Sequence, residues 1–363
     1  MIETALKHVE AGRHLSMEQM AEALGHIMAG RCAEEEIARL LTALHRKGET
    51  VAEVAGAAAA MRRQMAPIRT RRVGVIDTCG TGGDASRTFN ISTAAALVTA
   101  AAGVPVAKHG NRGITSRSGS ADVLAALGVN VEAGVACVEA CLEELGICFC
   151  FAPLLHAAMK HVAAVRKRLP HPTIFNILGP LVNPASAPFQ LLGVGRPELR
   201  PLLAEALGML QKFEGDSPIF AGAKIGTVPE AKNGTVPSPR ALVVHGADRL
   251  DEVTLGDVTF VTEAAVGNLR SFTWSPTDFG LEEATREEML VDGPQESAAM
   301  IRGMLDGRRG PARDIVLVNA AAALWTAGRH PSLRECVRLA AEAVDSGAAR
   351  DLLARLAERT HVP

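Results

Sequence analysis

The sequence predicts an α/β protein in which a small N-terminal helical domain precedes a larger α/β domain with a central, mostly parallel sheet flanked by helices. Three observations support this prediction. Capped helices fill the first part of the chain, strand-like apolar runs alternate with helical stretches after it, and a glycine-rich loop follows the first apolar run. Strands that alternate with helices are typical of an α/β domain. We place the helical domain at 1–68 and the α/β domain at 73–357.

The helical domain is predicted from capping signals. Ser16 with Gln19, and Thr50 with Glu53, have the spacing of capping boxes, in which groups at the start of a helix satisfy each other's hydrogen bonds. Gly48 follows the stretch AEEEIARLLTALHRK, and glycine commonly ends a helix. The first domain therefore consists of short helices.

Apolar runs predict the strands of the second domain. They lie at 73–77, 104–108, 148–152 and 241–245, and helical stretches separate them. The segment 213–239 interrupts this pattern. Because it is rich in Gly and Pro, it predicts an inserted surface loop.

Composition and charge argue against several classes of protein. Lys plus Arg number 38 and Asp plus Glu number 40, so a formal charge of −2 gives no overall attraction to nucleic acid or anionic membranes. The seven cysteines are unevenly spaced and lack a CxxC pair, which favours buried free thiols over a disulfide framework or a zinc site. Because the sequence shows neither a long apolar run nor a secretory signal, we expect a cytoplasmic protein.

The loop Gly80–Asp84 is the first candidate binding site. It places three glycines in four residues directly after an apolar run, and a helix follows from about Asn90 to Gly103. Glycines let backbone amides approach an anion, and a helix N-terminus, where Ser92 and Thr93 lie, carries partial positive charge. The loop and the helix start together predict a phosphate-binding cradle.

Other functions of the same loop compete with this interpretation. Gly80, Gly82 and Ala85 fit the loose G-x-G-x-x-A pattern of dinucleotide-binding folds, but that fold needs an acidic residue after the next strand, where this chain has Lys108. A Walker-type nucleotide loop is excluded because no Gly-Lys-Ser/Thr follows. The loop by itself is also consistent with an ordinary tight turn, in which the glycines only allow the backbone conformation of the turn.

The segment Lys108–Ser120 strengthens the phosphate interpretation. It contains three cations, a histidine, an asparagine and four hydroxyl side chains directly after a predicted strand. Between the cations, Gly, Ser and Asn supply the amide and hydroxyl donors that phosphate oxygens need, which an ordinary solvated charge run lacks. We interpret it as a second anion-binding segment.

Seven motifs in order resemble the anthranilate phosphoribosyltransferase family. They are GTGGD at Gly80, NIST at Asn90, KHGNR at Lys108 with SGSAD at Ser118, FAPLLHAAMKHVAAVR at Phe151, TIFNILGPLVNP at Thr173, VVHGADRLDE at Val243 and DIVLVNAAAAL at Asp314. The resemblance runs from Ile2 to about Leu356 and is interrupted by the segment 213–239. Motifs in a fixed order are far more specific than any one of them.

The resemblance implies an enzyme that transfers the 5-phosphoribosyl group of phosphoribosyl pyrophosphate to the amine of anthranilate, the second step of tryptophan biosynthesis from chorismate. It implies Mg²⁺ as cofactor, with two ions per active site held by Ser92, Asp251 and Glu252. Hard cations with oxygen ligands neutralise the charge of a leaving pyrophosphate. It also implies a homodimer formed through the helical domain, with no nucleic-acid or membrane partner.

The resemblance further assigns the substrate contacts. The donor contacts are Gly80, Gly83, Asp84, Thr88, Asn90, Ile91, Ser92, Thr93, Lys108, His109, Gly110, Asn111, Arg112, Ser116 and Ser120. The anthranilate contacts are Gly80, Asn111, His156, Arg166 and Pro180. The guanidinium of Arg166 suits a planar carboxylate because it offers a fork of donors. His109 is expected in the same pocket and is a candidate general base, whereas no covalent nucleophile is expected.

Two rival functions make different demands on the sequence. A relative of this fold that binds nucleic acid should be strongly basic and should lack Asn111 and Arg166, whereas this chain has a slight negative charge and contains both residues. A pyrimidine nucleoside phosphorylase has a similar two-domain architecture, but KHGNR with SGSAD fits the transferase. Phosphorolysis of thymidine or uridine would favour the phosphorylase.

Overall fold

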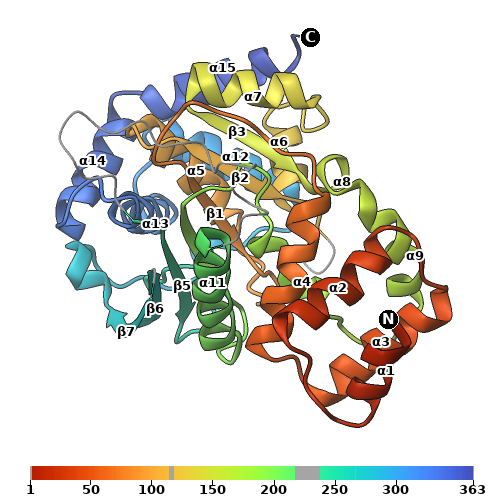
Figure 1. Ribbon diagram of the computed structural model, residues 1–363. Helices are drawn as coiled ribbons and strands as arrows, with labels where there is room; N and C mark the ends of the chain where they lie inside the picture. Colours follow the sequence, from red (N-terminus) through yellow and green to blue (C-terminus); the bar gives the residue numbers. More distant parts are fainter. Residues whose placement is uncertain (1, 114–117, 217–237, 266, 363) are drawn as a thin grey trace.

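The computed structural model describes residues 2–113, 118–216, 238–265 and 267–362. The small helical domain consists of α1 (Ile2–Glu10), α2 (Met17–Met28), α3 (Glu34–Lys47) and α4 (Val51–Gln64) (Figure 1). Both predicted capping boxes are confirmed, since Ser16 and Thr50 accept the backbone N–H groups of Gln19 and Glu53. Gly48 follows α3 with a φ of 82°, as expected for a glycine that ends a helix.

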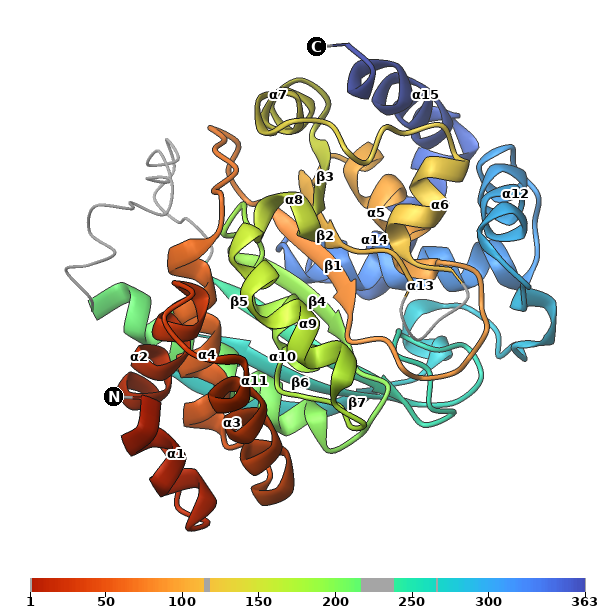
Figure 2. The same ribbon diagram turned by 90° about the vertical axis from the view of Figure 1, so that its right-hand side faces the viewer.

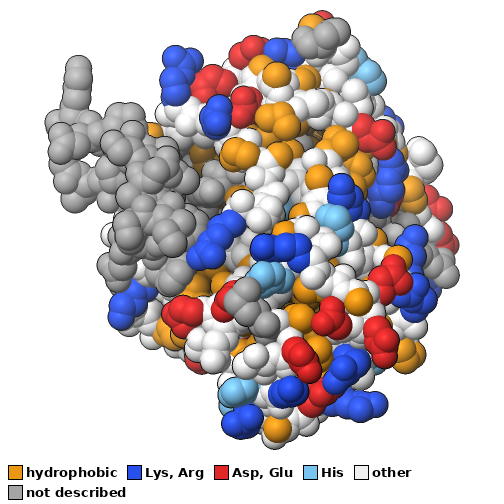
Figure 3. Space-filling view, turned by 45° about the vertical axis from the view of Figure 1, so that its right-hand side comes forward, with side chains coloured by type: hydrophobic (Ala, Val, Ile, Leu, Met, Phe, Trp, Pro, Cys, Tyr) orange, Lys and Arg blue, Asp and Glu red, His pale blue; other side chains and the backbone are white. Residues whose placement is uncertain are grey.

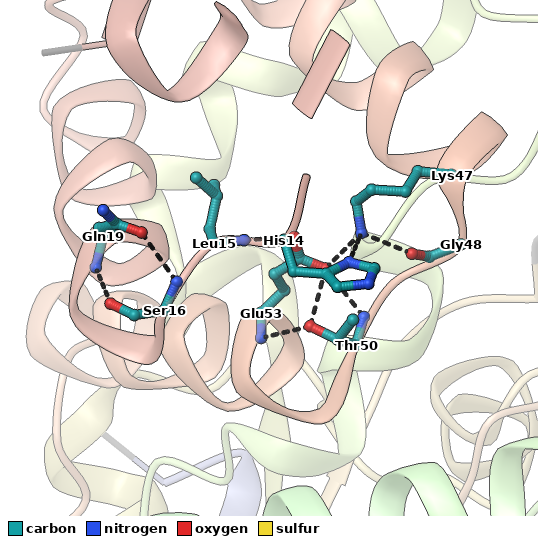
Figure 4. Close-up of polar contacts among 8 residues, drawn as sticks. All are labelled: His14, Leu15, Ser16, Gln19, Lys47, Gly48, Thr50 and Glu53. Atoms are coloured by element: carbon teal, nitrogen blue, oxygen red, sulfur yellow. Dashed lines mark hydrogen bonds and ion pairs between the residues drawn. The ribbon is translucent and has the colours of Figure 1, made fainter. Parts of the chain in front are cut away.

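A buried ion pair joins the loops between the helices of the helical domain (Figure 4). Lys47 donates to Glu53 Oε2 at 2.8 Å, and both side chains are almost fully buried. Glu53 also accepts the N–H groups of Leu15 at 3.0 Å and Thr50 at 2.9 Å, while Lys47 Nζ lies 3.0 Å from His14 Nδ1. The pair therefore fixes the connection between α1 and α2 against the start of α4.

The larger domain is built on one sheet, which in the described part of the chain has seven strands in the order β3-β2-β1-β4-β5-β6-β7. The strands are β1 (Ile76–Gly80), β2 (Val106–Gly110), β3 (Ile147–Phe151), β4 (Phe189–Gly193), β5 (Arg240–Gly246), β6 (Thr259–Ala265) and β7 (Asn268–Trp274). Strands β1 to β5 pair in parallel, and β6 and β7 are added antiparallel at one edge. The prediction of a mostly parallel sheet is confirmed.

All four predicted strands lie in this sheet, with shifted ends. The first begins at Ile76 and not at Val73, because Gly74 has a φ of 72° that interrupts an extended chain. The second begins at Val106, after Pro105, whose nitrogen cannot donate to a strand ladder. The apolar runs did not predict β4, β6 or β7, and β7 is largely exposed at the edge of the sheet.

Helices cover both faces of the sheet. One core contains α5 (Ile91–Ala101), α6 (Ser120–Ala126), α7 (Val135–Leu145), α12 (Pro294–Leu305), α13 (Pro311–Thr326), α14 (Leu333–Asp345) and α15 (Ala348–Thr360). The second core joins the other face to the helical domain through α9 (Lys160–Arg168), α10 (Phe175–Leu178) and α11 (Leu199–Asp216). Figures 1 and 2 show α1 to α4 on the side of the molecule away from α13 to α15. Neighbouring residues of one strand serve both cores, as Leu191 and Leu192 do in β4.

The predicted inserted loop starts later than expected. Helix α11 continues to Asp216, so residues 213–216 are helical and the expectation of a loop from 213 was wrong there. The stretch FEGD contains no proline, and a single glycine in a helix costs only about 1 kcal/mol. Residues 217–237 of the predicted loop lie outside the described residues.

Three further expectations can be compared with the structure. All seven cysteines are free thiols, and six of them are buried. No helix within the described ranges is long and apolar enough to cross a membrane. On the face drawn in Figure 3, Lys and Arg side chains are interspersed with Asp and Glu and do not form one basic surface.

Candidate active site

The order of the strands marks the carboxyl ends of β1 and β4 as the expected binding position. From β1 the chain passes to β2 and β3 on one side, and it later returns to β4 on the other side of β1. In open α/β sheets, ligands bind at the carboxyl ends of the strands where the order reverses in this way. Gly80 at the end of β1 pairs there with Gly193 at the end of β4.

These two glycines pack directly against the turn that carries the predicted metal ligands. A Cβ on Gly193 would lie 1.6 Å from the carbonyl oxygen of Asp251, and a Cβ on Gly80 would lie 2.7 Å from Asp251 Oδ2. The N–H of Gly82 donates to Asp251 Oδ2 at 3.0 Å. The glycine loop therefore holds the acidic turn in place through close backbone approach.

Three carboxylates gather at this position. Asp251 and Glu252 retain some open surface but are otherwise surrounded by protein, and burial followed by the neighbouring charge of Asp84 raises the pKa of Asp251 well above its usual range. Burial also raises the pKa of Glu252 to about 8, although Lys108 opposes this change. Asp84 Oδ2 is buried without a hydrogen-bond partner among the described residues. Ionisation of this cluster is therefore unfavourable unless a cation lies close to it.

A hard cation fits this donor set. Carboxylate oxygens that repel one another, one of them without a partner, are stabilised by a divalent metal ion. Within the described ranges, no group of three or more His, Cys, Asp or Glu side chains could hold a metal by itself. Mg²⁺ commonly uses one or two carboxylates together with substrate phosphates, so the neighbouring carboxylates of Asp251 and Glu252 suit that ion.

Lys108 connects the acidic cluster to the start of α5. Its Nζ donates to the carbonyl oxygen of Thr78 at 2.6 Å and to Ser92 Oγ at 3.0 Å. Burial lowers the pKa of Lys108, while neighbouring carboxylates, including Glu252, act in the opposite direction. Lys108 thus links the end of β1 with a predicted metal ligand.

The start of α5 is held by a side-chain cap and by a contact from α12. Asn90 Oδ1 caps the helix by accepting the N–H of Thr93 at 3.1 Å, and Ile91 is its first residue. Asn90 is held in turn by Ser297 on α12, whose Oγ accepts the Asn90 N–H at 2.9 Å. Thr88 forms an isolated bridge with a residue that precedes α12. Contacts from α12 and from the residues just before it therefore hold Thr88 and Asn90.

Asp122 closes the second anion-binding segment. Its Oδ2 accepts the N–H groups of Gly113 at 2.8 Å and Gly119 at 3.2 Å, and its Oδ1 pairs with Arg112 at 3.4 Å. Ser120 Oγ donates to the carbonyl oxygen of Asn111 at 3.4 Å. One carboxylate therefore joins both ends of the segment.

The remaining residues of this segment can be placed more briefly. Gly110 is the last residue of β2, and a Cβ there would lie 2.1 Å from Ser120 Oγ. Gly83 is exposed with a φ of 82°. The predicted donor contact Ser116 lies outside the described residues.

Two buried histidines form a hydrogen-bonded pair. His109 lies in β2, and His156 follows α8 (Ala152–Leu155). Their Nε2 atoms are 3.1 Å apart, and His109 Nδ1 lies 3.0 Å from the carbonyl oxygen of Gly179. Gly179 precedes Pro180, whose carbonyl accepts a hydrogen bond from Gln190 Nε2 at 2.6 Å. The predicted pocket residues His109, His156 and Pro180 are therefore brought together.

Arg166 lies in the last turn of α9, as the sequence predicts. Its guanidinium carbon lies over the Phe175 ring, 5.4 Å from the ring centre, and burial lowers the pKa of Arg166. In the described residues no hydrogen bond joins Arg166 to the histidine pair. The structure thus shows two groups of contacts, one around the carboxylates and one around the histidines. Among the described residues, Arg166 has no hydrogen bond to either group.

Sequence reasoning missed several residues that shape this site. Gly193 ends the run FQLLG, but a glycine after a short apolar run does not by itself identify a site. Asp122 ends the SGSAD motif but was not given a role. Ser297 and Gln190 carry no distinctive local signal, since their importance comes only from contacts with distant segments.

Comparison with known proteins identifies the family. The family described as "Glycosyl transferase family, helical bundle domain" matches residues 3–65, and "Glycosyl transferase family, a/b domain" matches residues 72–217 and 223–350. An anthranilate phosphoribosyltransferase of Moorella thermoacetica is 45% identical over 349 residues, which cover 96% of this chain and 95% of the relative. Its counterpart in Rhodospirillum rubrum is 49% identical over 348 residues, covering 96% and 92%.

Solved structures are similar over the whole chain. The crystal structure of anthranilate phosphoribosyltransferase from Thermus thermophilus has a TM-score of 0.85 at 41% identity and covers 99% of both chains. The enzyme from Saccharomyces cerevisiae in complex with PRPP and Mg has a TM-score of 0.83 at 27% identity, covering 99% of this chain and 97% of that one. The yeast enzyme in complex with 4-fluoroanthranilate has a TM-score of 0.80 at 26% identity, covering 99% and 98%.

Proposed function

Since the chain belongs to the anthranilate phosphoribosyltransferase family, we propose that it transfers the 5-phosphoribosyl group of phosphoribosyl pyrophosphate to the amine of anthranilate. It is a magnesium-dependent pentosyltransferase whose products are N-(5-phosphoribosyl)anthranilate and pyrophosphate. The reaction is the second step of tryptophan biosynthesis from chorismate.

The contact between the glycine loop and the acidic turn is the observation that supports this function best. Gly82 donates its N–H to Asp251, and Lys108 lies between the carboxylates and the start of α5. Amides, a helix terminus, a lysine and carboxylates therefore meet at the strand reversal. A metal-bound diphosphate requires both the cationic and the anionic part of this set.

Ser92, Asp251 and Glu252 would hold Mg²⁺, with two ions in each active site. When bound, the metal neutralises the charge that develops on the leaving pyrophosphate. The yeast relative was solved in complex with PRPP and Mg, which supports the same cofactor here. A metal ion at this acidic turn would reduce the repulsion between the carboxylates of Asp84, Asp251 and Glu252, which supports this position for the metal.

The donor is held mainly by fixed dipoles and one buried cation. The amides of the glycine loop and the capped start of α5 point to where phosphate oxygens bind, and Lys108 adds a positive charge that is already oriented by Thr78 and Ser92. Asn111 and Ser120, joined to each other, supply further polar contacts. Because these groups are held by the fold, little reorganisation is needed when charge develops.

The acceptor is oriented by Arg166, with Asn111, His156, Pro180 and Gly80 around it. The Arg166 guanidinium lies over the Phe175 ring, and its N–H donors bind the carboxylate of anthranilate. The amine then attacks C1 of the ribose as pyrophosphate leaves. The complex of the yeast relative with 4-fluoroanthranilate supports the class of acceptor.

The assembly and location follow the family expectations. The helical domain at 1–68 forms a homodimer, and the domain at 73–357 carries the transfer reaction. The enzyme works in the cytoplasm on small soluble substrates, without nucleic acid or membrane.

The direct test measures anthranilate fluorescence in the presence of phosphoribosyl pyrophosphate, with and without Mg²⁺. The proposal requires loss of anthranilate fluorescence that depends on both the donor and the metal. Phosphorolysis of thymidine or uridine without anthranilate turnover would contradict it.

Arg166→Ala tests how the acceptor is recognised. We expect the KM for anthranilate to rise by about 10- to 150-fold, because a charge-assisted contact worth about 1.5–3 kcal/mol is lost, while the KM for the donor changes little. Lys167→Ala, an exposed neighbour in the same turn, is the matched control. Equal changes in both KM values would contradict the assignment of Arg166.

A further inference from the structure

The hydrogen bonds of the histidine pair have a defined direction. His109 Nδ1 lies 3.0 Å from the carbonyl oxygen of Gly179, and a carbonyl can only accept. The hydrogen of neutral His109 is therefore on Nδ1, and its Nε2 carries a lone pair. Since the two Nε2 atoms are 3.1 Å apart, His156 must donate from Nε2. Neutral His156 consequently has its free lone pair on Nδ1.

Groups outside the pair hold this direction in place. Buried Gln190 on β4 donates from Nε2 to the carbonyl oxygen of Pro180, the residue after Gly179, at 2.6 Å. The backbone N–H of His109 donates to Asp77 Oδ1 at 3.1 Å. The backbone of His109 and the residue after Gly179 are therefore both held by neighbouring strands.

The surroundings of His156 suit an aromatic acceptor. Among the described residues, no hydrogen bond occupies Nδ1 of His156. His156 is bordered by Met28, Met61, Gln64, Ala158 and Met159. Thioether and aliphatic groups pack well against a flat ring. The charged groups near the pair are Lys108 and Asp77, which belong to β2 and β1 and lie on the side of His109.

We propose that His156 Nδ1 accepts the proton of the attacking amine, and that His109 and Gln190 are positioning residues that present this atom to the acceptor. This inference rests on the proposed function. It replaces His109 as the candidate base, because both ring nitrogens of His109 are already used.

Atoms and charge balance in this step. The lone pair of the amine forms the C1–N bond, and the C1–O bond breaks with its electron pair remaining on the pyrophosphate oxygen. The nitrogen becomes positively charged, and its proton moves to His156 Nδ1. His156 is then an imidazolium that still donates from Nε2 to His109, and it returns the proton to water after the products leave.

The basicity of the pair is suited to this acceptor. Burial lowers the pKa of His156 to about 4, and burial together with the charge of His156 lowers that of His109 to about 3. Both rings are therefore neutral at pH 7, with the lone pair available. An arylamine that has formed its C–N bond is a strong acid, so a weak base suffices to remove its proton.

The test uses two replacements that separate the ring nitrogens from a general effect of substitution. His156→Gln retains an amide near the Nε2 position, where it can donate to His109, but removes the Nδ1 acceptor. We expect kcat to fall by about 100-fold, the lower range for loss of a general base, with little change in the KM for anthranilate. His161→Gln on α9 is the matched control and should leave kcat unchanged.

Ring-fluorinated anthranilates provide a readout that a structural role would not change. Fluorine makes the ammonium form of the amine more acidic, so its proton leaves more easily without a base. The kcat defect of His156→Gln should therefore shrink several-fold with the fluorinated acceptor. The proposal would be overturned if His156→Gln lost the same factor in kcat with anthranilate and with the fluorinated anthranilate. An effect of this variant on KM alone, or an unchanged kcat, would also overturn it.

Nitrogen NMR of the ¹⁵N-histidine-labelled wild-type enzyme tests the same inference without a variant. At pH 7, His156 should show an unprotonated Nδ1 and a protonated Nε2, and Gln190→Leu should produce a mixture of tautomers. A protonated Nδ1 in the wild type would overturn the inference. The wild-type enzyme could show the expected tautomers of His156 by NMR and yet fail to consume anthranilate. In that case the proposed function is wrong, but the direction of the hydrogen bond between the two histidines is still correct.

Discussion

Replacing Gly193 by alanine tests whether close packing of β4 against the acidic turn positions the predicted metal ligands. A Cβ at this position would lie 1.6 Å from the carbonyl oxygen of Asp251, whereas real Cβ atoms essentially never lie closer than 3.0 Å. The strand and the turn must therefore separate by at least the difference between 3.0 and 1.6 Å. The obstacle is backbone and not the end of a flexible side chain, so local rotamer changes cannot remove it.

The expected loss is larger in activity than in stability. A displacement of about 1 Å in a catalytic arrangement costs about 100-fold in rate, so we expect kcat/KM to fall by at least that factor. Overpacking typically costs about 1–3 kcal/mol, which a domain with about 5–15 kcal/mol of stability tolerates. Gly193→Ala should therefore remain folded but require more Mg²⁺ for its residual turnover.

The assay is anthranilate fluorescence across a magnesium titration, with far-ultraviolet circular dichroism to verify folding. Gly208→Ala is the matched control, because the same substitution in α11 meets no atom within 4 Å. It should retain full activity and gain up to about 1 kcal/mol of stability from helix propensity. If Gly193→Ala retained wild-type kcat/KM and magnesium dependence, the packing argument would be refuted.

Two further predictions concern stability. Glu53→Gln should lower the free energy of unfolding in urea by about 3 kcal/mol, because Lys47 keeps a buried charge without its partner. The exposed change Glu22→Gln should alter that free energy by less than about 0.5 kcal/mol, and equal effects would contradict the role of the pair. Burial lowers the pKa of His109 to about 3 and of His156 to about 4, so below the ordinary value of 6.5 the unfolded chain binds more protons than the folded chain. The free energy of unfolding should therefore decrease as pH falls from about 6.5, by up to about 1.4 kcal/mol per pH unit for each histidine, and equal urea stability at about pH 7 and pH 5 would contradict this.

The architecture could be predicted from local patterns to the extent that its elements are independent of distant contacts. The capping boxes at Ser16 and Thr50 depend on residues three positions away, and both were predicted correctly. The start of β1 was placed too early because an apolar run does not reveal the left-handed φ of Gly74. Strand β7 is exposed along most of its length, so it lacks the apolar pattern by which buried strands are recognised.

The candidate site was predicted through its motifs, and the contacts that hold those motifs required the structure. Asn90 was predicted as part of the anion-binding helix start, but the bond from its N–H to Ser297 joins residues 207 positions apart. Gly193 resembles any glycine after an apolar run until the carbonyl of Asp251 is found directly above it. Such contacts depend on which strands and helices become neighbours in the fold. Local patterns in a single sequence do not show which distant elements pack together.

The direction of the histidine pair shows why residue types alone do not assign chemical roles. His109 follows Lys108 in a phosphate-binding motif and was the natural candidate for a base. The deciding group is a backbone carbonyl of Gly179, 70 positions away, which any residue type would provide. Because that carbonyl can only accept, it determines the tautomer of His109, and His109 in turn determines that of His156. The atom that can take a proton is thus selected by chain geometry, and the two histidines are chemically distinct although their sequence signals are alike.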